Sequence, residues 1–177
     1  MLFRSLASAL LADAPLLGEL DGRVVVACSG GADSIGLLLL ARHAGLDTVA
    51  VHVDHGLRPG SAADADLVAA VAQRCGAASA AVRVEVEPGP NLEARARDAR
   101  FAALHAHAAR LGAQHVAVAH TLDDQAETVL LAVLRGSGTP GLAGMAARRG
   151  AVVRPLLGVR RAAVRAFVDA RSEEHTS

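Results

Sequence analysis

The sequence has 177 residues, 18 basic and 18 acidic side chains, and no net formal charge; all of its basic residues are arginines. Without lysine it can form neither a lysine-bearing P-loop nor a lysine Schiff base, and with two cysteines it offers neither a disulfide framework nor a cysteine-rich metal cluster. A hydrophobic share of 52% suffices for one core, and no apolar run reaches the roughly 20 residues of a membrane span, so we expect one cytoplasmic domain over residues 1–170 with no membrane partner.

The elements predicted in chain order alternate between helix and strand. An amphipathic helix opens the chain, and β-branched runs then alternate with helical stretches, which indicates right-handed βαβ units. We therefore predict an α/β fold, with an open, mostly parallel five-stranded sheet, helices on both faces, and a ligand site beyond the carboxyl ends of the strands. The predicted strands are 23–28, 48–53, 80–86, 115–120 and 151–157, and the predicted helices are 34–44, 61–74, 92–111, 122–135 and 159–170.

The loop SGGADS follows the first predicted strand. Ser29, Gly30 and Gly31 can adopt positive φ values and admit a close anion, and the next helix directs free N–H groups to the same point. Asp33 would repel a phosphate unless a divalent cation lies between them, or unless it merely caps the helix. A plain glycine turn with an acidic cap is the alternative interpretation.

The second predicted strand ends in HVDH. His52, Asp54 and His55 should emerge at the rim of the ligand site, before a turn at Arg58-Pro59-Gly60. His52 could instead be buried and hydrogen-bonded within the sheet.

The helix predicted over 92–111 carries Arg97 and Arg100 three residues apart, hence on one face. Their guanidinium groups could bind phosphates of a nucleotide or of RNA. The alternative is a surface ion pair between Glu93 and Arg97, one turn apart, worth roughly 0.3 to 0.5 kcal/mol.

The segment AHTLDDQAET follows the fourth predicted strand. Thr121 can cap the next helix with Asp124 as its capping-box partner, but capping does not explain the three carboxylates of Asp123, Asp124 and Glu127. Like charges at this spacing oppose one another unless a cation lies among them, so we expect Mg²⁺ or an ammonium group there. His120 is close enough to serve as an acid or base.

An acid-free stretch with seven arginines lies between Glu127 and Asp169. Such a local basic region attracts phosphate, although a solvated arginine-rich surface would give the same pattern. The seven are Arg135, Arg148, Arg149, Arg154, Arg160, Arg161 and Arg165.

Five blocks together resemble a known family. SGGADS is similar to the SGGxDS pyrophosphate loop of the PP-loop ATP pyrophosphatase superfamily. With VDHGLRPGS, NLEARARDARFAAL, AHTLDDQAETVLLAVLRGSGTPGLAGM and VVRPLL in the same order, residues 20 to 170 resemble the N-terminal catalytic domain of the bacterial tRNA(Ile)-lysidine synthases. The resemblance implies a Rossmann-like fold of the adenine nucleotide alpha hydrolase type.

The resemblance also implies a two-step reaction with ATP and Mg²⁺. The C2 oxygen of the wobble cytidine in a tRNA(Ile) with a CAU anticodon is adenylated, and free L-lysine then displaces AMP. By motif position, catalytic roles fall to Asp33, Arg97, Arg100, His120, Asp124 and Glu127, with Asp124 and Glu127 holding the lysine. Nucleotide binding falls to Ser29, Gly30, Gly31, Ala32, Asp33, Ser34, Val53 and Asp54, and metal binding to Asp33 and Asp123.

Two rival functions remain open from the sequence. A tRNA thiolase of the same fold would ordinarily need more cysteines than Cys28 and Cys75, and a non-catalytic ATP-binding α/β module would share the architecture alone. Family members continue past this domain, whereas residues 171–177 (RSEEHTS) show no helical or strand pattern and look like a translated adapter remnant. We therefore expect a truncated chain that lacks C-terminal RNA-binding regions, and the oligomeric state stays open between monomer and homodimer.

Overall fold

The structure is a computed structural model that describes residues 2–54, 61–86, 89–137 and 142–173. Its centre is a mixed sheet in the order β3-β2-β1-β4-β6-β5. Neighbouring strands from β3 to β6 in this order pair in parallel, and β5 at the edge runs antiparallel to β6. The α/β prediction is thus confirmed, with six strands rather than five. They are β1 (Arg23–Ala27), β2 (Asp47–Asp54), β3 (Ala78–Arg83), β4 (His115–Ala117), β5 (Arg148–Arg149) and β6 (Val152–Val153).

The edge of the sheet beyond β4 differs most from the prediction. The strand predicted over 151–157 is only two residues long, and the chain turns after Val153. β5 consists of two exposed arginines that pair with β6 through the backbone. It has no alternation of apolar and polar residues from which a strand could be predicted.

The helices agree closely with the predicted ranges. The two central helices begin and end at the predicted residues, and the amphipathic helix at the start of the chain is also confirmed. The last helix continues through Glu173, so the first residues of the predicted tail are helical. The elements are α1 (Leu2–Asp13), a short 3-10 helix η1 (Pro15–Glu19), α2 (Ala32–His43), α3 (Ser61–Arg74), α4 (Leu92–Leu111), α5 (Leu122–Leu134) and α7 (Arg161–Glu173).

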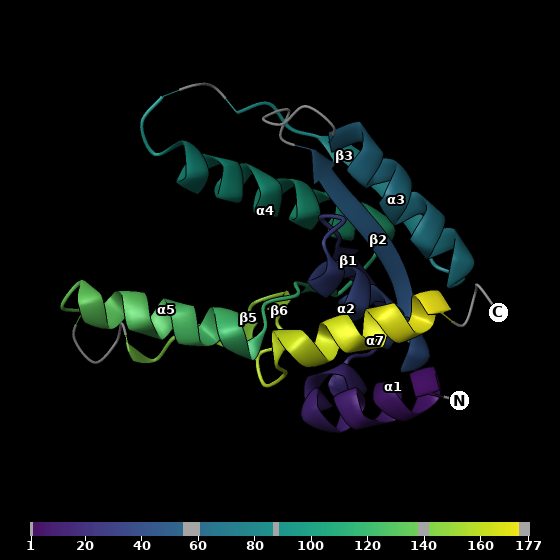
Figure 1. Ribbon diagram of the computed structural model, residues 1–177. Helices are drawn as coiled ribbons and strands as arrows, with labels where there is room; N and C mark the ends of the chain where they lie inside the picture. The colour runs from purple at the N-terminus through teal and green to yellow at the C-terminus, as the bar shows by residue number, and fades with distance from the viewer. Residues whose placement is uncertain (1, 55–60, 87–88, 138–141, 174–177) are drawn as a thin grey trace.

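Two apolar clusters cover the two faces of the sheet. Val24 and Val26 of β1 pack into a large cluster with residues of α1, α2, α3 and α7, whereas Val25 points to the opposite face and packs with Leu104 of α4. This alternation follows from the period of two along a strand. Figure 1 shows α4 on one side of the sheet and α1 and α7 on the other, while α5 extends away from the body of the molecule. In the described ranges, no helix is long and apolar enough to cross a membrane.

The strand order reverses between β1 and β4, which are direct neighbours. In parallel α/β sheets, such a switch point opens a crevice at the carboxyl ends of the two strands. The loop after β1 and the segment after β4 are the two acid-bearing motifs of the sequence, so the topology brings them to the same place.

Candidate active site

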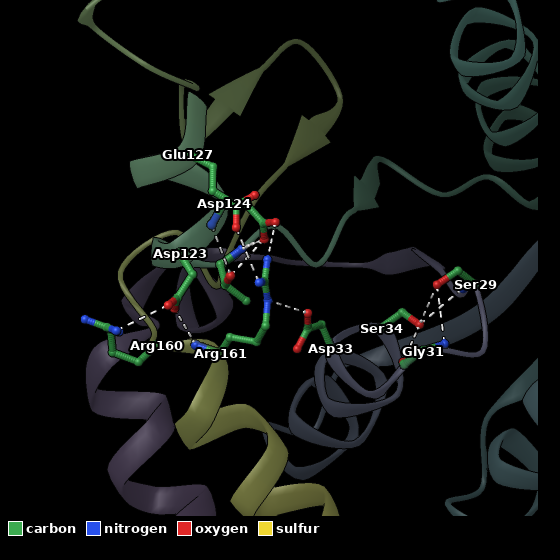
Figure 2. A network of polar contacts seen from close by, with 10 residues as sticks. Ser29, Gly31, Asp33, Ser34, Asp123, Asp124, Glu127, Arg160 and Arg161 are labelled. Atoms are coloured by element: carbon green, nitrogen blue, oxygen red, sulfur yellow. Dashed lines mark hydrogen bonds and ion pairs between the residues drawn. The ribbon is translucent and has the colours of Figure 1, made fainter. Parts of the chain in front are cut away.

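The loop after β1 is held open by its own side chains. The Ser29 N–H donates to Ser34 Oγ (3.2 Å), and the Ser34 hydroxyl donates to the Gly31 carbonyl (2.9 Å), as Figure 2 shows. Gly30 has a φ of 88°, where side chains are strained, and a Cβ there would lie 3.1 Å from Oδ1 of Asp64 on α3. Gly31, in contrast, is extended at φ −73°, so of the two glycines Gly30 alone needs positive φ.

Asp33 lies in the first turn of α2, beside this loop. Its Oδ1 is buried without a hydrogen-bond partner, and its Oδ2 lies 3.4 Å from Nε of Arg161. Burial raises the pKa of Asp33 above its ordinary value, with Arg161 opposing that rise and Asp124 adding to it. A buried, unpartnered carboxylate oxygen beside a phosphate loop fits a divalent cation.

A cavity of about 640 Å³ opens beside the loop at the carboxyl ends of β1, β2 and β4. Of the predicted nucleotide residues, Ala32 alone is absent from its lining; of the predicted catalytic residues, Arg97 and Glu127 lie outside it. Asp64 and Leu104 are lining residues that the sequence analysis missed, because nothing in their local pattern distinguishes them. The predicted residues in the lining are Ser29, Gly30, Gly31, Asp33, Ser34, Val53, Asp54, Arg100, His120 and Asp124.

His52, near the end of β2, is hydrogen-bonded within the sheet and also lines the cavity. The ring is buried, and Nδ1 donates to the Cys28 carbonyl at 2.9 Å, as the structural interpretation requires. Its Nε2 has no hydrogen-bond partner, although His52 lines the cavity with Val53 and Asp54. His55 and the predicted turn after it lie outside the described residues.

The two arginines of α4 flank one aromatic ring. The guanidinium carbons of Arg97 and Arg100 lie 5.1 and 5.3 Å from the centroid of Phe101, and neither has a carboxylate partner among the described residues. The surface pair of Arg97 with Glu93 is therefore not formed. Burial, followed by the neighbouring Arg97, lowers the pKa of Arg100. Cations without acidic partners beside a cavity favour an anionic ligand.

His120 lies in the same cationic surroundings. Burial lowers its pKa to about 4, and the charges of Arg154 and Arg97 act in the same direction. Its imidazole is therefore neutral at pH 7 and its Nδ1 is buried without a partner. A neutral ring can orient a substrate by hydrogen bonding, but it cannot donate a proton as an imidazolium at that pH.

Arg154 is a buried arginine, although the sequence analysis placed it in a basic region open to phosphate or solvent. It is only 7% exposed, its Nη1 donates to the Ala146 carbonyl at 2.8 Å, and its Nε has no partner. Burial lowers its pKa, with Arg97 next in effect. Arg154 thus belongs to the interior around His120 rather than to a solvated basic surface.

Asp124 serves as both the cap of α5 and a wall of the cavity. Its Oδ2 accepts from the backbone N–H and the hydroxyl of Thr121 (2.7 and 2.8 Å), which completes the predicted capping box. Its Oδ1 accepts from Arg161 Nη2 at 2.6 Å. Burial disfavours the charge, but the bonds from Thr121 and the charge of Arg161 outweigh it and lower the pKa of Asp124.

We expected Mg²⁺ or an ammonium group among the acids, and in the structure the guanidinium of Arg161, the first residue of α7, lies there. Figure 2 shows its side chain reaching between the two acidic motifs. Its three guanidinium nitrogens face three carboxylates, with Nη2 at 2.6 Å from Asp124, Nε at 3.4 Å from Asp33 and Nη1 at 3.5 Å from Glu127. The sequence analysis missed this role because 37 residues separate Arg161 from Asp124.

Asp123 points to α7 rather than to the loop after β1. Its Oδ2 accepts from the Arg161 backbone N–H at 2.8 Å, and its Oδ1 lies 3.2 Å from Arg160 Nη2. The Arg161 N–H is the main cause of its lowered pKa. Asp123 therefore caps α7, and no contact joins it to Asp33. Among the described residues, no three acidic, histidine or cysteine side chains are grouped as metal ligands, and metal binding by Asp33 and Asp123 stays a prediction.

Comparison with known proteins agrees with this geometry. The model of the PP-loop domain family matches residues 6–176, so the chain belongs to that family, which indicates ATP binding. The chain is 49% identical over 155 residues to tRNA(Ile)-lysidine synthase of Thermus thermophilus, covering 85% of this chain and 30% of that protein. It is 53% identical over 143 residues to tRNA(Ile)-lysidine synthase of Nocardia farcinica, covering 80% of this chain and 44% of that one. It thus spans less than half the length of these relatives.

A solved structure shares the fold. The U34-tRNA thiolase NcsA from Methanococcus maripaludis, determined with its [4Fe-4S] cluster, superposes with a TM-score of 0.74. The match covers 93% of this chain and 65% of that one, at 16% sequence identity. At that identity the similarity concerns the fold.

Proposed function

We propose that this chain is the ATP-binding catalytic domain of a tRNA(Ile)-lysidine synthase, a ligase that joins lysine to C2 of the wobble cytidine. The observation that carries the proposal is that the phosphate loop, Asp33 and Asp124 line one cavity at the β1–β4 switch point. The identity of about 50% to two lysidine synthases supports it.

In the first step, the cytidine O2 attacks the α-phosphorus of ATP, and the bond to pyrophosphate breaks. The free N–H groups at the start of α2, together with Arg100, would stabilise the charge that develops on pyrophosphate. Asp33, whose Oδ1 has no partner in the chain, would hold Mg²⁺ there, and the ion would supply positive charge beside the phosphates. Neutral His120 would orient the base by a hydrogen bond.

In the second step, the ε-amine of lysine attacks C2 and the bond from C2 to the adenylate oxygen breaks, releasing AMP. Asp124 and Glu127 lie where they can hold the ammonium group near the phosphate loop. The amine must lose a proton before it attacks. Glu127 is the better acceptor for it, because Asp124 has a lowered pKa and both its oxygens are engaged, whereas the Glu127 side chain is 64% exposed.

The proposal is tested by tRNA-dependent exchange of pyrophosphate into ATP. The chain is extended with the remaining C-terminal part of the Thermus thermophilus relative, and exchange should require tRNA(Ile) with a CAU anticodon. Asp33→Asn should abolish exchange, whereas Asp169→Asn, at an exposed position of α7, should not. Pyrophosphate exchange that does not depend on tRNA would contradict the proposal. So would the absence of exchange in an extended protein that binds ATP.

The thiolase alternative fits the cysteines less well. Clusters of the [4Fe-4S] type are usually held by cysteine thiolates, and this sequence has two cysteines. Cys28 is buried, and burial raises the pKa of its thiol to about 12, so it stays protonated. The cysteines of this chain therefore favour the lysidine synthase proposal over the thiolase alternative.

A further inference from the structure

Arg161 occupies the position where a substrate ammonium group is expected. Each of its three guanidinium nitrogens faces a different carboxylate, and the shortest contact is the 2.6 Å bond to Asp124. Such a charge-assisted hydrogen bond is strong, particularly where the pair is partly shielded from water. The negative charge of the acid cluster of Asp33, Asp124 and Glu127 is therefore already partly compensated within the chain.

We propose that Arg161 is a resident cation of the acid cluster and that an incoming lysine ammonium group must displace it. The inference rests on the proposed function for the identity of this substrate. Asp124 Oδ2 already accepts two hydrogen bonds from Thr121, and Oδ1 accepts from the Arg161 guanidinium at 2.6 Å, so a second cation at Oδ1 would lie beside the first and be repelled by it. The arriving amine thus competes with the guanidinium for one oxygen of Asp124 and for Glu127.

The Arg161 side chain can move away from the acids without disrupting α7. It is 28% exposed, and its contact with Glu127 is a long one at 3.5 Å to a carboxylate that is mostly in solvent. The helix does not depend on this side chain for its cap, because Asp123 accepts from the Arg161 backbone N–H. The guanidinium can therefore move while α7 stays in place.

Displacement would also connect the two substrates. Arg161 bridges Asp33 of the phosphate loop and Asp124 of α5, and Asp33 is the candidate metal ligand. When the guanidinium leaves, the positive charge 3.4 Å from Asp33 Oδ2 leaves with it. The filling of the acid cluster by lysine is thereby linked electrostatically to the phosphate loop.

The test measures L-lysine binding to the ATP-saturated chain by titration calorimetry. Arg161→Gln removes the competing charge and should tighten lysine binding at least threefold, and Arg161→Lys should give an intermediate affinity. Arg160→Gln is the matched control, because the 69% exposed Arg160 side chain contacts Asp123 only. L-norleucine, which lacks the ε-ammonium group, should gain no affinity in any variant.

Each other outcome decides against the inference. If Arg161→Gln weakens lysine binding and Arg161→Lys restores it, Arg161 positions the acids instead of competing for them. Unchanged affinity means that the guanidinium is not in the way, and an equal gain for L-norleucine means that the ammonium group is not what it excludes. If no variant binds lysine, the freed acids are not an ammonium site and the inference fails, whereas the proposed function is decided separately by tRNA-dependent exchange.

Discussion

At the scale of single residues, two glycines of similar backbone conformation differ in what an added side chain would contact. Gly30 and Gly45 both have strongly positive φ values, 88° and 82°. A Cβ at Gly45 meets nothing within 4 Å, whereas one at Gly30 meets Asp64 in the wall of the cavity. The same substitution at both positions therefore separates backbone strain from ligand contact.

We predict that Gly30→Ala weakens ATP binding at least tenfold, because the new methyl group crowds the surface against which the phosphates would lie. Gly45→Ala should leave ATP affinity unchanged. Both variants should lose about 1 kcal/mol of unfolding free energy, since each forces a side chain into the left-handed region. Fluorescent-nucleotide titration measures the ATP affinity, and urea unfolding measures the free energy of unfolding. Equal ATP affinity in both variants would show that the phosphates do not lie against Gly30.

His120 makes a pH-dependent contribution to stability with a definite sign. Its folded pKa of about 4 lies below the ordinary value of 6.5, so between these pH values the unfolded chain binds a proton that the folded chain does not. Stability must therefore fall as the pH is lowered through this window.

We predict that His120→Gln makes the loss of stability between pH 6.5 and 4.5 smaller by about 1 kcal/mol, a figure reduced for the partial exposure of the ring. Urea unfolding at the two pH values measures it. His107→Gln, at a partly buried position of α4 outside the cavity lining, is the matched histidine substitution against which the change is compared. An identical pH dependence in His120→Gln would show that this ring is not the titrating group.

At the scale of elements, the contact between α2 and α7 sets where Arg161 lies. A Cβ on Gly36 of α2 would stand 2.4 Å from Val164 Cγ1, so only glycine permits the observed approach of the two helices. Val164 is one turn along α7 from Arg161, and this close packing holds the start of α7 beside the phosphate loop.

We predict that Gly36→Ala destabilises the fold by about 1 to 3 kcal/mol through overpacking. At an unhindered helical site the same change would stabilise by about 1 kcal/mol, so the sign of the measured effect is decisive. Val164→Ala should be costly alone but should recover part of the loss in the Gly36→Ala background, as a double-mutant cycle of urea unfolding can show. Additive effects would mean that the two side chains do not meet.

The elements also show where prediction from sequence succeeds. The bounds of α3 and α4 and the capping box of Thr121 and Asp124 follow from local patterns, so they were predictable. The arginine-rich stretch misled, because Arg154 is buried and Arg161 pairs with acids. Such pairings join residues far apart in the chain, and composition carries no information about which of several arginines turns inward.

At the scale of the whole molecule, exposed arginines and exposed apolar side chains lie outside the cavity lining. Arg135, Arg148, Arg149, Arg160 and Arg165 remain exposed. α5 has no buried residue, and Leu134 is 73% exposed at its end. Neither feature belongs to the cavity itself.

We predict that the chain alone binds tRNA weakly and that extension with the C-terminal part of a lysidine synthase relative strengthens binding with a marked salt dependence. In the extended protein, replacing Arg148 and Arg149 by glutamine should lower affinity and reduce the slope of log affinity against log salt by about one to two. Filter binding at several salt concentrations measures both effects. Equal affinity with and without the extension would mean that the exposed arginines suffice.

The rings of Phe3 and Phe167 stack at 4.6 Å, and Arg171 lies over the Phe3 ring at 4.7 Å. The first and last described helices are thus fastened to each other on the far side of the sheet from α4 (Figure 1). A peptide linker of a few residues could join them, so the domain should tolerate circular permutation with new termini opened at a surface turn. In such a rearranged molecule α7, the linker and α1 would form an internal helical hairpin, and α7 would still pack beside the loop after β1.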